Sequence, residues 1–290
     1  MIVSFKRGEN NMNKNVTDEK EYLNHYSIEK YERPSLTSDI VAFTVKTQES
    51  DDYRKLPERK LSILLVKRDD YPFKGQYALP GGFVSSKESV EENAYRKLKE
   101  KAGIEDVVLS QLKVFSKLGR DPRGWVVSCA FMALAEENKY KISSNKRINE
   151  KWFSVYYKKQ DNDIYNLILE NEEDKLSAVI QVGDEFTKGN EEAFKVIKSE
   201  NIAFDHAEII ACAVQKLRHD LYSHELAFEL VPKYFTLTDL QTICEIVLDE
   251  KLIKANFRRK IKDLVEETDK LSEGAGHRPA RLFVKKSCIN

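Results

Sequence analysis

One stretch, from residue 82 to residue 103, constrains this 290-residue chain more than any other part of its sequence. Gly82 is followed at fixed spacings by Glu88, Arg96 and Glu100, and Gly103 closes the stretch. Positions 97, 100 and 101 of a helix lie about one turn apart, so their side chains converge on one place. The spacing therefore predicts a glycine loop followed by a helix that carries one charged cluster.

The boundaries of this helix can be predicted from its flanking residues. Ser85 and Glu88 have the spacing of a capping box, in which each side chain bonds the backbone of the other residue. Gly103 is suited to the left-handed conformation that ends many helices. The sequence therefore predicts a helix from about Ser86 to Ala102.

The same stretch resembles a Nudix box, the loop-helix-loop that holds magnesium against a diphosphate, with two departures. Lys97 and Lys101 stand where the resemblance expects glutamate. Magnesium takes oxygen ligands, and an ammonium group supplies none, so Glu100 alone would hold the ion weakly. Two readings stay open: the lysines face the pocket and neutralise a diphosphate directly, or they point to water. Either way we predict no catalytic residue and no resident metal.

The bulk composition fits an intracellular protein of two domains. Apolar residues make up 41% of the chain, and 48 basic residues balance 48 acidic ones. The sequence has neither the run of about 18 apolar residues that a membrane span needs nor the apolar segment of a signal peptide. Its four cysteines are scattered without a CxxC pair, which favours reduced thiols. We therefore predict a cytoplasmic protein that does not contact the membrane.

The pattern along the chain predicts three parts. Residues 1–36 are polar and read as an extension, with Met12 as an alternative start. Residues 37–205 read as a first, strand-rich domain, and 206–290 read as a helix followed by a second domain. In the second part the expected strands are 40–45, 61–66, 112–118, 126–135 and 152–157, with a hairpin over 166–180. Residues 183–200 read as a polar segment, and 206–221 have helical spacing of apolar residues.

The last part has the pattern of a winged helix-turn-helix. A helix opening at Thr236 is followed by a second from Ile253 to about Leu264, and strands follow at 265–271 and near 282. Between residues 251 and 286 there are eleven basic residues against five acidic ones, in a chain whose net charge is zero. This local surplus of positive charge favours binding to double-stranded DNA.

The predicted DNA contacts follow from the second helix and the wing. Asn256 is a candidate reader of adenine, because its amide can pair with that base. The other candidates are cations that suit the major groove or the phosphates: Arg258, Arg259, Lys260, Arg278 and Arg281.

Taken together, the chain resembles the Nudix-related transcriptional regulators of NAD metabolism. The matching pieces are 72–75, 79–83, 120–124, 204–206 and 276–280, in the family's order. The resemblance implies an α+β fold, a Nudix α/β/α sandwich followed by a winged helix-turn-helix domain. It also implies a homodimer that binds a palindromic operator and is released from DNA by ADP-ribose or a related effector. The effector-binding residues expected from this resemblance and from the lysine substitutions are Arg68, Gly81, Gly82, Lys97, Lys101, Arg120 and Arg123.

Two alternatives remain open at this point. An active Nudix hydrolase of ADP-ribose could assemble a shifted metal site from the glutamates of the box, Glu88, Glu91, Glu92 and Glu100. A regulator of carbohydrate genes that responds to a sugar would share the fold but not the effector.

Overall fold

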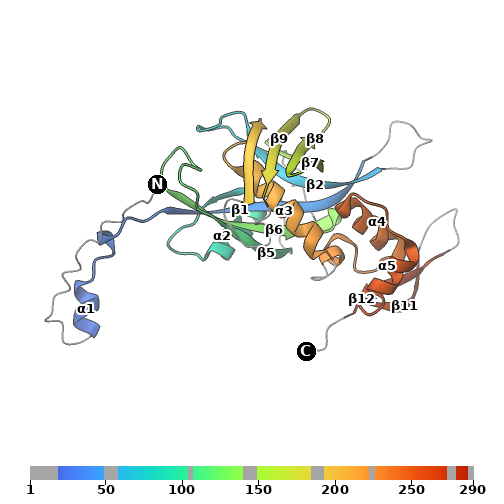
Figure 1. Ribbon diagram of the computed structural model, residues 1–290. Helices are drawn as coiled ribbons and strands as arrows, with labels where there is room; N and C mark the ends of the chain where they lie inside the picture. The colour runs from blue at the N-terminus through green and yellow to red at the C-terminus, as the bar shows by residue number, and fades with distance from the viewer. Residues whose placement is uncertain are drawn as a thin grey trace. The chain divides into compact units, whose positions relative to one another are not determined.

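The computed structural model describes residues 19–48, 58–103, 107–139, 149–183, 193–221, 226–272 and 279–286 (Figure 1). Residues 1–34 and 35–290 form two separate compact units. The first contains the helix α1 (Glu19–His25) and the short 3-10 turn η1 (Ile28–Lys30), whose large apolar side chains are exposed. Met12 lies outside the described residues. The first strand already begins at Ser35, so the predicted extension ends slightly earlier than residue 36.

The second unit is built on one mixed sheet of ten strands. Its strands are β1 (Ser35–Gln48), β2 (Glu58–Lys67), β3 (Tyr77–Ala78), β4 (Gly81–Phe83), β5 (Val108–Phe115), β6 (Val126–Leu134), β7 (Glu150–Asp161), β8 (Ile164–Glu170), β9 (Lys175–Val182) and β10 (Phe194–Glu200). Eight follow the order β10-β9-β8-β7-β2-β1-β6-β5, while β3 pairs with β2 and β4 with β1. The central pair β1 and β6 is parallel. The 3-10 turns η2 (Glu137–Lys139) and η5 (Leu226–Leu230) lie in the connections.

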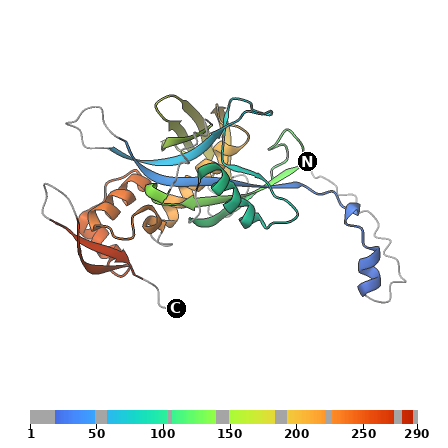
Figure 2. The same ribbon diagram turned by 180° about the vertical axis from the view of Figure 1, so that it is seen from behind.

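Helices cover both faces of this sheet (Figures 1 and 2). The side chains of β1, which point alternately to the two faces, explain why both need cover. Ile40 and Ala42 pack with residues of α2 (Val90–Ala102), whereas Val41 and Phe43 belong to the apolar cluster that includes α3 (His206–Asp220). Successive side chains of a strand point to opposite faces, so an unbroken apolar run needs cover on both sides. The predicted α/β/α sandwich is confirmed.

The C-terminal elements form the predicted winged helix-turn-helix. The helices α4 (Leu237–Leu248) and α5 (Lys254–Ile261) are followed by the two-stranded sheet of β11 (Val265–Leu271) and β12 (Arg281–Lys285). The helix predicted to open at Thr236 is present, and Thr236 caps it, because its hydroxyl accepts the Asp239 N–H at 3.0 Å. The last helix is shorter than predicted, ending at Ile261.

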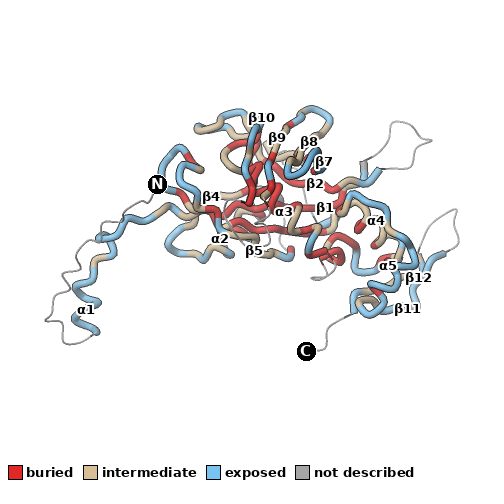
Figure 3. Tube along the Cα trace, viewed as in Figure 1, coloured by how far each residue is buried: buried red, intermediate tan, exposed pale blue. Residues whose placement is uncertain are grey.

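The C-terminal helices and the sheet bury their apolar side chains in one shared core. One apolar cluster runs from Val41 of β1 through Ile210 of α3 to Ile243 of α4 and Phe257 of α5. Figure 3 shows the buried positions concentrated in the central strands and α3, while the outer side of α5 and the wing strands are exposed. The helices α3 and α4 therefore share one apolar core with the sheet.

Three details of the secondary structure differ from the sequence prediction. The helix of the box begins at Val90, because Ser89 and Glu92 form the capping box; Ser85 and Glu88 form a turn before it instead. Strand β5 ends at Phe115 and does not reach residue 118. The expected polar segment contains β10, which has mostly exposed residues and therefore no apolar alternation to reveal it.

No helix within the described ranges combines the length and the apolar character needed to cross a bilayer.

Candidate effector site and DNA-binding face

The glycine loop is held tightly against the first strand. Gly81 pairs with Asp39 of β1, and an added Cβ at Gly81 would meet the Ser38 carbonyl oxygen and lie 2.6 Å from Asp39 Oδ1. A Cβ at Gly82 would lie 2.8 Å from Cε of Lys97, the far end of a flexible side chain. Gly81 is therefore required by a rigid backbone contact, while Gly82 leaves room for Lys97.

We predict that Gly81→Ala lowers the free energy of unfolding by about 2 kcal/mol, because the new methyl group has no space beside the strand backbone. Urea denaturation of the purified protein measures this effect. Gly183→Ala is the matched control, since a Cβ there would meet nothing within 4 Å. Equal stability of the two variants would contradict the predicted packing of the loop.

Two acidic residues of the box, Glu88 and Glu100, are already paired with cations of the protein. Arg96 donates two hydrogen bonds to Glu88, at 2.9 and 2.8 Å, and a third to Glu100 at 2.9 Å. Hydrogen bonds from Arg96 and Asn93 hold the pKa of Glu88 far below its usual range, and bonds from Lys97 and Arg96 lower the pKa of Glu100. Both carboxylates are thus ionised, but their charge is neutralised within the fold.

Both substituted lysines stand at positions where the Nudix box has carboxylate ligands for magnesium. The Lys97 ammonium lies 3.0 Å from Glu100 Oε2, and Lys101 lines a pocket at the end of the glycine loop. Within the described ranges there is no group of three or more histidine, cysteine, aspartate or glutamate side chains that could hold a metal ion. The residues present do not fit magnesium, because cations replace the oxygen ligands that it needs.

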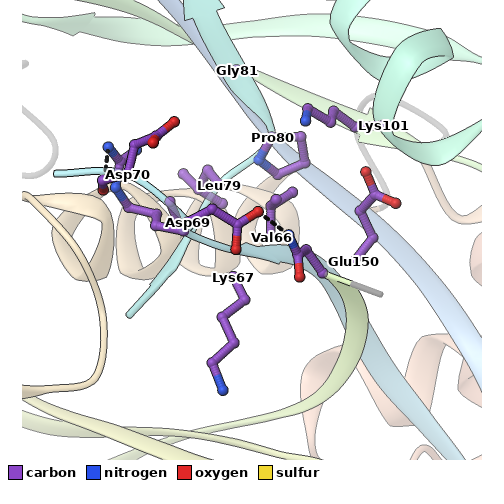
Figure 4. Close-up of a pocket in the computed structure, with 12 residues that line it drawn as sticks. Val66, Lys67, Asp69, Asp70, Leu79, Pro80, Gly81, Lys101 and Glu150 are labelled. Atoms are coloured by element: carbon purple, nitrogen blue, oxygen red, sulfur yellow. Dashed lines mark hydrogen bonds between the residues drawn. The ribbon is translucent and has the colours of Figure 1, made fainter. Parts of the chain in front are cut away.

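Three predicted effector-binding residues, Arg68, Gly81 and Lys101, meet in this pocket of about 430 Å³. Figure 4 shows Lys101 reaching in from α2 toward Pro80, with the Glu150 carboxylate nearby on β7. The other lining residues come from the end of β2, the loop before β4 and the start of β7: Val66, Lys67, Asp69, Asp70, Ala78, Leu79, Pro80, Asn149 and Glu150. Asn149 donates to the Asp69 carboxylate and ties the two walls together.

Arginines and aromatic rings alternate beside the pocket. The Arg68 guanidinium lies 4.8 Å from the ring centre of Phe204, and Arg123 lies 5.4 Å from Phe204 and 4.9 Å from Phe83. Phe73 packs edge-on against Phe204, with ring centres 4.7 Å apart. Stacking of this kind holds guanidinium groups in place. Arg123 also donates to both carboxylate oxygens of Asp121, at 2.9 and 2.6 Å, and Arg68 donates to the Pro72 carbonyl at 2.8 Å. Burial and the nearby charge of Arg123 lower the pKa of Arg68, so an anionic ligand would relieve their repulsion.

Arg120 has a different position from the one expected for a ligand contact. Its side chain is only 4% exposed, and it donates to both carboxylate oxygens of Asp205, at 2.8 and 2.7 Å. It also lies 3.5 Å from Asp39. Its bonds to Asp205 raise its pKa although burial opposes the charge. Arg120 therefore anchors the residue that precedes α3.

His206, the first residue of α3, accepts a hydrogen bond from the segment that leads into the glycine loop. Its Nδ1 accepts the Leu79 N–H at 2.9 Å, and burial lowers the pKa of the imidazole. The ring is therefore neutral, with Nε2 protonated and facing Asp39 at 3.7 Å. The sequence assigned no ligand role to His206, and the structure gives it a structural one. Asp39, Phe204 and Asp205 were missed as parts of the site, because the two distant segments that contain them meet only in the fold.

The candidate DNA-binding face presents the predicted cations to solvent. Phe257 and Ile261 anchor α5 in the core, so the intervening Arg258, Arg259 and Lys260 are exposed. Asn256 is also exposed and accepts a hydrogen bond from Arg259 at 3.2 Å. On the wing, Arg281 lies 3.0 Å from Glu267; Arg278 lies outside the described residues.

A sandwich sheet with a glycine loop and box helix, joined to a winged helix, defines a DNA-binding regulator built on a Nudix domain. Family models agree with both parts: the Nudix domain model matches residues 55–198, and the NrtR DNA-binding winged helix model matches residues 227–284. Over 273 residues, the chain is 31% identical to an ADPR-responsive transcriptional repressor from Acinetobacter baylyi, covering 93% of this chain and 89% of that protein. The chain belongs to this family of Nudix-related transcriptional regulators.

Solved structures show the same two-part architecture. A MutT/nudix family protein from Enterococcus faecalis matches with a TM-score of 0.68 and 25% identity, over 91% of each chain. Shewanella oneidensis NrtR in complex with a 27mer DNA matches with a TM-score of 0.59 and 26% identity, over 87% of this chain and 93% of that one. The chain also resembles an ADP-ribose pyrophosphatase from Methanocaldococcus jannaschii over a shorter stretch, with 51% identity over 75 residues. This stretch covers 26% of this chain and 44% of that protein.

Proposed function

We propose that this protein is a homodimeric repressor that binds a palindromic operator and leaves it when ADP-ribose or a closely related nucleotide occupies the Nudix domain. The proposal divides the chain into an effector-binding domain, 37–205, and a DNA-binding part, 206–290, that acts in the cytoplasm. The observation that carries it is the replacement of box carboxylates by Lys97 and Lys101, with Lys101 in the pocket wall and Lys97 against Glu100.

The cationic surroundings of the pocket support an anionic effector. Arg68 lines the pocket with Lys101, and Arg123 stacks beside it on the same aromatic ring. Fixed cations can neutralise a diphosphate without a metal ion, since each charge-assisted hydrogen bond contributes about 1.5–3 kcal/mol. The repressor activity of the Acinetobacter relative, which covers most of this chain, supports the choice of ADP-ribose.

Effector release follows from linkage between two sites. A ligand that binds the DNA-incompetent arrangement more tightly shifts the population toward it, and DNA must weaken ligand binding by the same factor. Release by ADP-ribose therefore requires that the occupied pocket prefers an arrangement of α4 and α5 that does not bind the operator.

A titration tests this function directly. Fluorescence anisotropy of labelled DNA from upstream of the protein's own gene should show a specific, salt-sensitive complex. ADP-ribose should release it, while ribose 5-phosphate and AMP should act only at much higher concentrations, because each lacks half of the ligand. Specific DNA binding that ADP-ribose leaves unchanged would refute the proposed effector.

The second candidate is hydrolysis of ADP-ribose, and the local match to the pyrophosphatase favours testing it. Incubation with ADP-ribose and magnesium, followed by chromatography for AMP and ribose 5-phosphate, distinguishes the two functions. We expect no turnover, because Glu88 and Glu100 are bonded to Arg96 rather than available as ligands.

A further inference from the structure

The helix α3 touches the candidate effector site at one end and the DNA-binding helices at the other. It contains 15 residues, which corresponds to a length of about 22 Å. At its start, Phe204 stacks with Arg68 and Arg123, and Asp205 holds Arg120. A ligand that draws the two stacked arginines toward its phosphates therefore changes the surroundings of the residues that begin α3.

At the other end, Arg218 bonds two different elements. Its Nε donates to the Val247 carbonyl of α4, and its Nη1 donates to the Tyr157 carbonyl of β7, both at 2.9 Å. Val247 lies in the last turn of α4, where carbonyl groups lack partners within the helix. The planar guanidinium has donors in fixed directions, so one side chain can hold α4 at a set position against β7.

Other polar contacts between α4 and the sheet are more exposed. Arg59 lies 3.6 Å from Asp239, and Lys158 lies 3.3 Å from Asp249, each with side chains at least 42% exposed. Exposed ion pairs contribute little to a fixed geometry. A pocket of about 440 Å³ also opens between β2, β7 and α4, with Arg218 in its wall. The pocket lies on one side of α4, while Leu240, Ile243 and Val247 bury its other side in the shared core. Arg218 therefore adds a directional polar restraint to that apolar packing.

We propose that Arg218 is the positioning residue that transmits occupancy of the effector pocket, through α3, to the DNA-binding helices. This inference rests on the proposed function for its ligand. Arg218 touches neither ligand nor DNA; its role is to make the position of α4 depend on the position of α3.

The experiment compares Arg218→Gln and Arg218→Lys with Lys216→Gln in the full-length protein. Lys216 is on the same helix and bonds Asp220 within it, at 2.7 Å, so it is a matched control. For each variant, operator affinity is measured with and without saturating ADP-ribose, and ADP-ribose affinity is measured without DNA. We expect wild-type ADP-ribose affinity throughout, whereas the ratio of the two DNA affinities should fall to about 2 or less in both Arg218 variants, from the 5- to 150-fold range of ordinary couplings.

Hydrogen exchange supplies a second measurement that does not depend on the effector. Exchange of the α4 amides should accelerate in Arg218→Gln and stay unchanged in Lys216→Gln, while α2 amides stay unchanged in both. A wild-type coupling ratio in either Arg218 variant would overturn the proposal. If Arg218→Gln does not fold, Arg218→Lys decides by the same criteria. If ADP-ribose does not act on the wild type, the proposed effector is wrong, and unchanged α4 exchange would then refute the role of Arg218.

Discussion

Replacing Arg258 and Arg259 together by alanine should lower operator affinity about 100-fold at physiological salt, since loss of an arginine contact to DNA costs about 1–3 kcal/mol. Both side chains are exposed on α5, between the residues that anchor this helix in the core. The loss should come with a smaller dependence of affinity on salt, by about 0.9 in the logarithmic slope for each phosphate contact removed. Anisotropy titrations at several salt concentrations measure both quantities.

The control for this experiment removes equal charge elsewhere. Lys159 and Lys195 are exposed lysines of the sheet domain, and their double replacement by alanine should leave the slope unchanged. A similar loss of affinity in both double variants would mean that only net charge matters. Unchanged binding in the Arg258 and Arg259 variant would place the DNA-binding face elsewhere.

The double variant Lys97→Glu with Lys101→Glu should bind ADP-ribose more weakly in the absence of metal and should gain a metal site. Without metal, its affinity for ADP-ribose should fall about 100-fold, because a carboxylate that repels phosphate oxygens replaces the Lys101 ammonium in the pocket wall. Manganese binding should appear at the same time, since two new carboxylates join Glu100 on one face of α2. Calorimetry with ADP-ribose and electron paramagnetic resonance with manganese measure the two effects.

A matched control makes the same change of charge on exposed positions. Lys87 and Lys99 lie before and within the box helix with exposed side chains, and their replacement by glutamate should preserve metal-free binding. Metal-free ADP-ribose binding at wild-type strength in the Lys97 and Lys101 variant would refute the view that fixed cations replace the ion. Hydrolysis of ADP-ribose by the manganese-bound variant would show that these two substitutions are enough to restore catalysis in this pocket.

The sequence predicted local features well where one residue type has one strong preference. Gly103 ends α2 in the left-handed conformation, with φ of 67°, as its position after the helical pattern indicated. Thr236 caps α4 in the same predictable way. The start of α2 was placed too early because two consecutive serine–glutamate pairs, Ser85 with Glu88 and Ser89 with Glu92, have capping spacing. Only the later pair, Ser89 and Glu92, is followed directly by the helical turns that complete it.

The candidate site was predictable in part for a related reason. The box residues lie within one short stretch, so their spacing alone brings Arg96, Lys97 and Glu100 together. Local spacing could not predict the ion pair of Arg120, because its partner Asp205 is 85 residues away in the chain. An arginine before an apolar strand looks the same in sequence whether it binds a ligand or a buried carboxylate.

By itself, the sequence determined the two-part architecture, the loss of magnesium ligands at positions 97 and 101, and the concentration of positive charge near the C-terminus, because these depend on residue type and local spacing. The tertiary structure alone decided which cations remain available to a ligand and how α3 connects the pocket to the winged helix. Those properties depend on long-range contacts, such as Leu79 with His206 and Arg218 with Val247, which burial of a shared core brings within hydrogen-bonding distance.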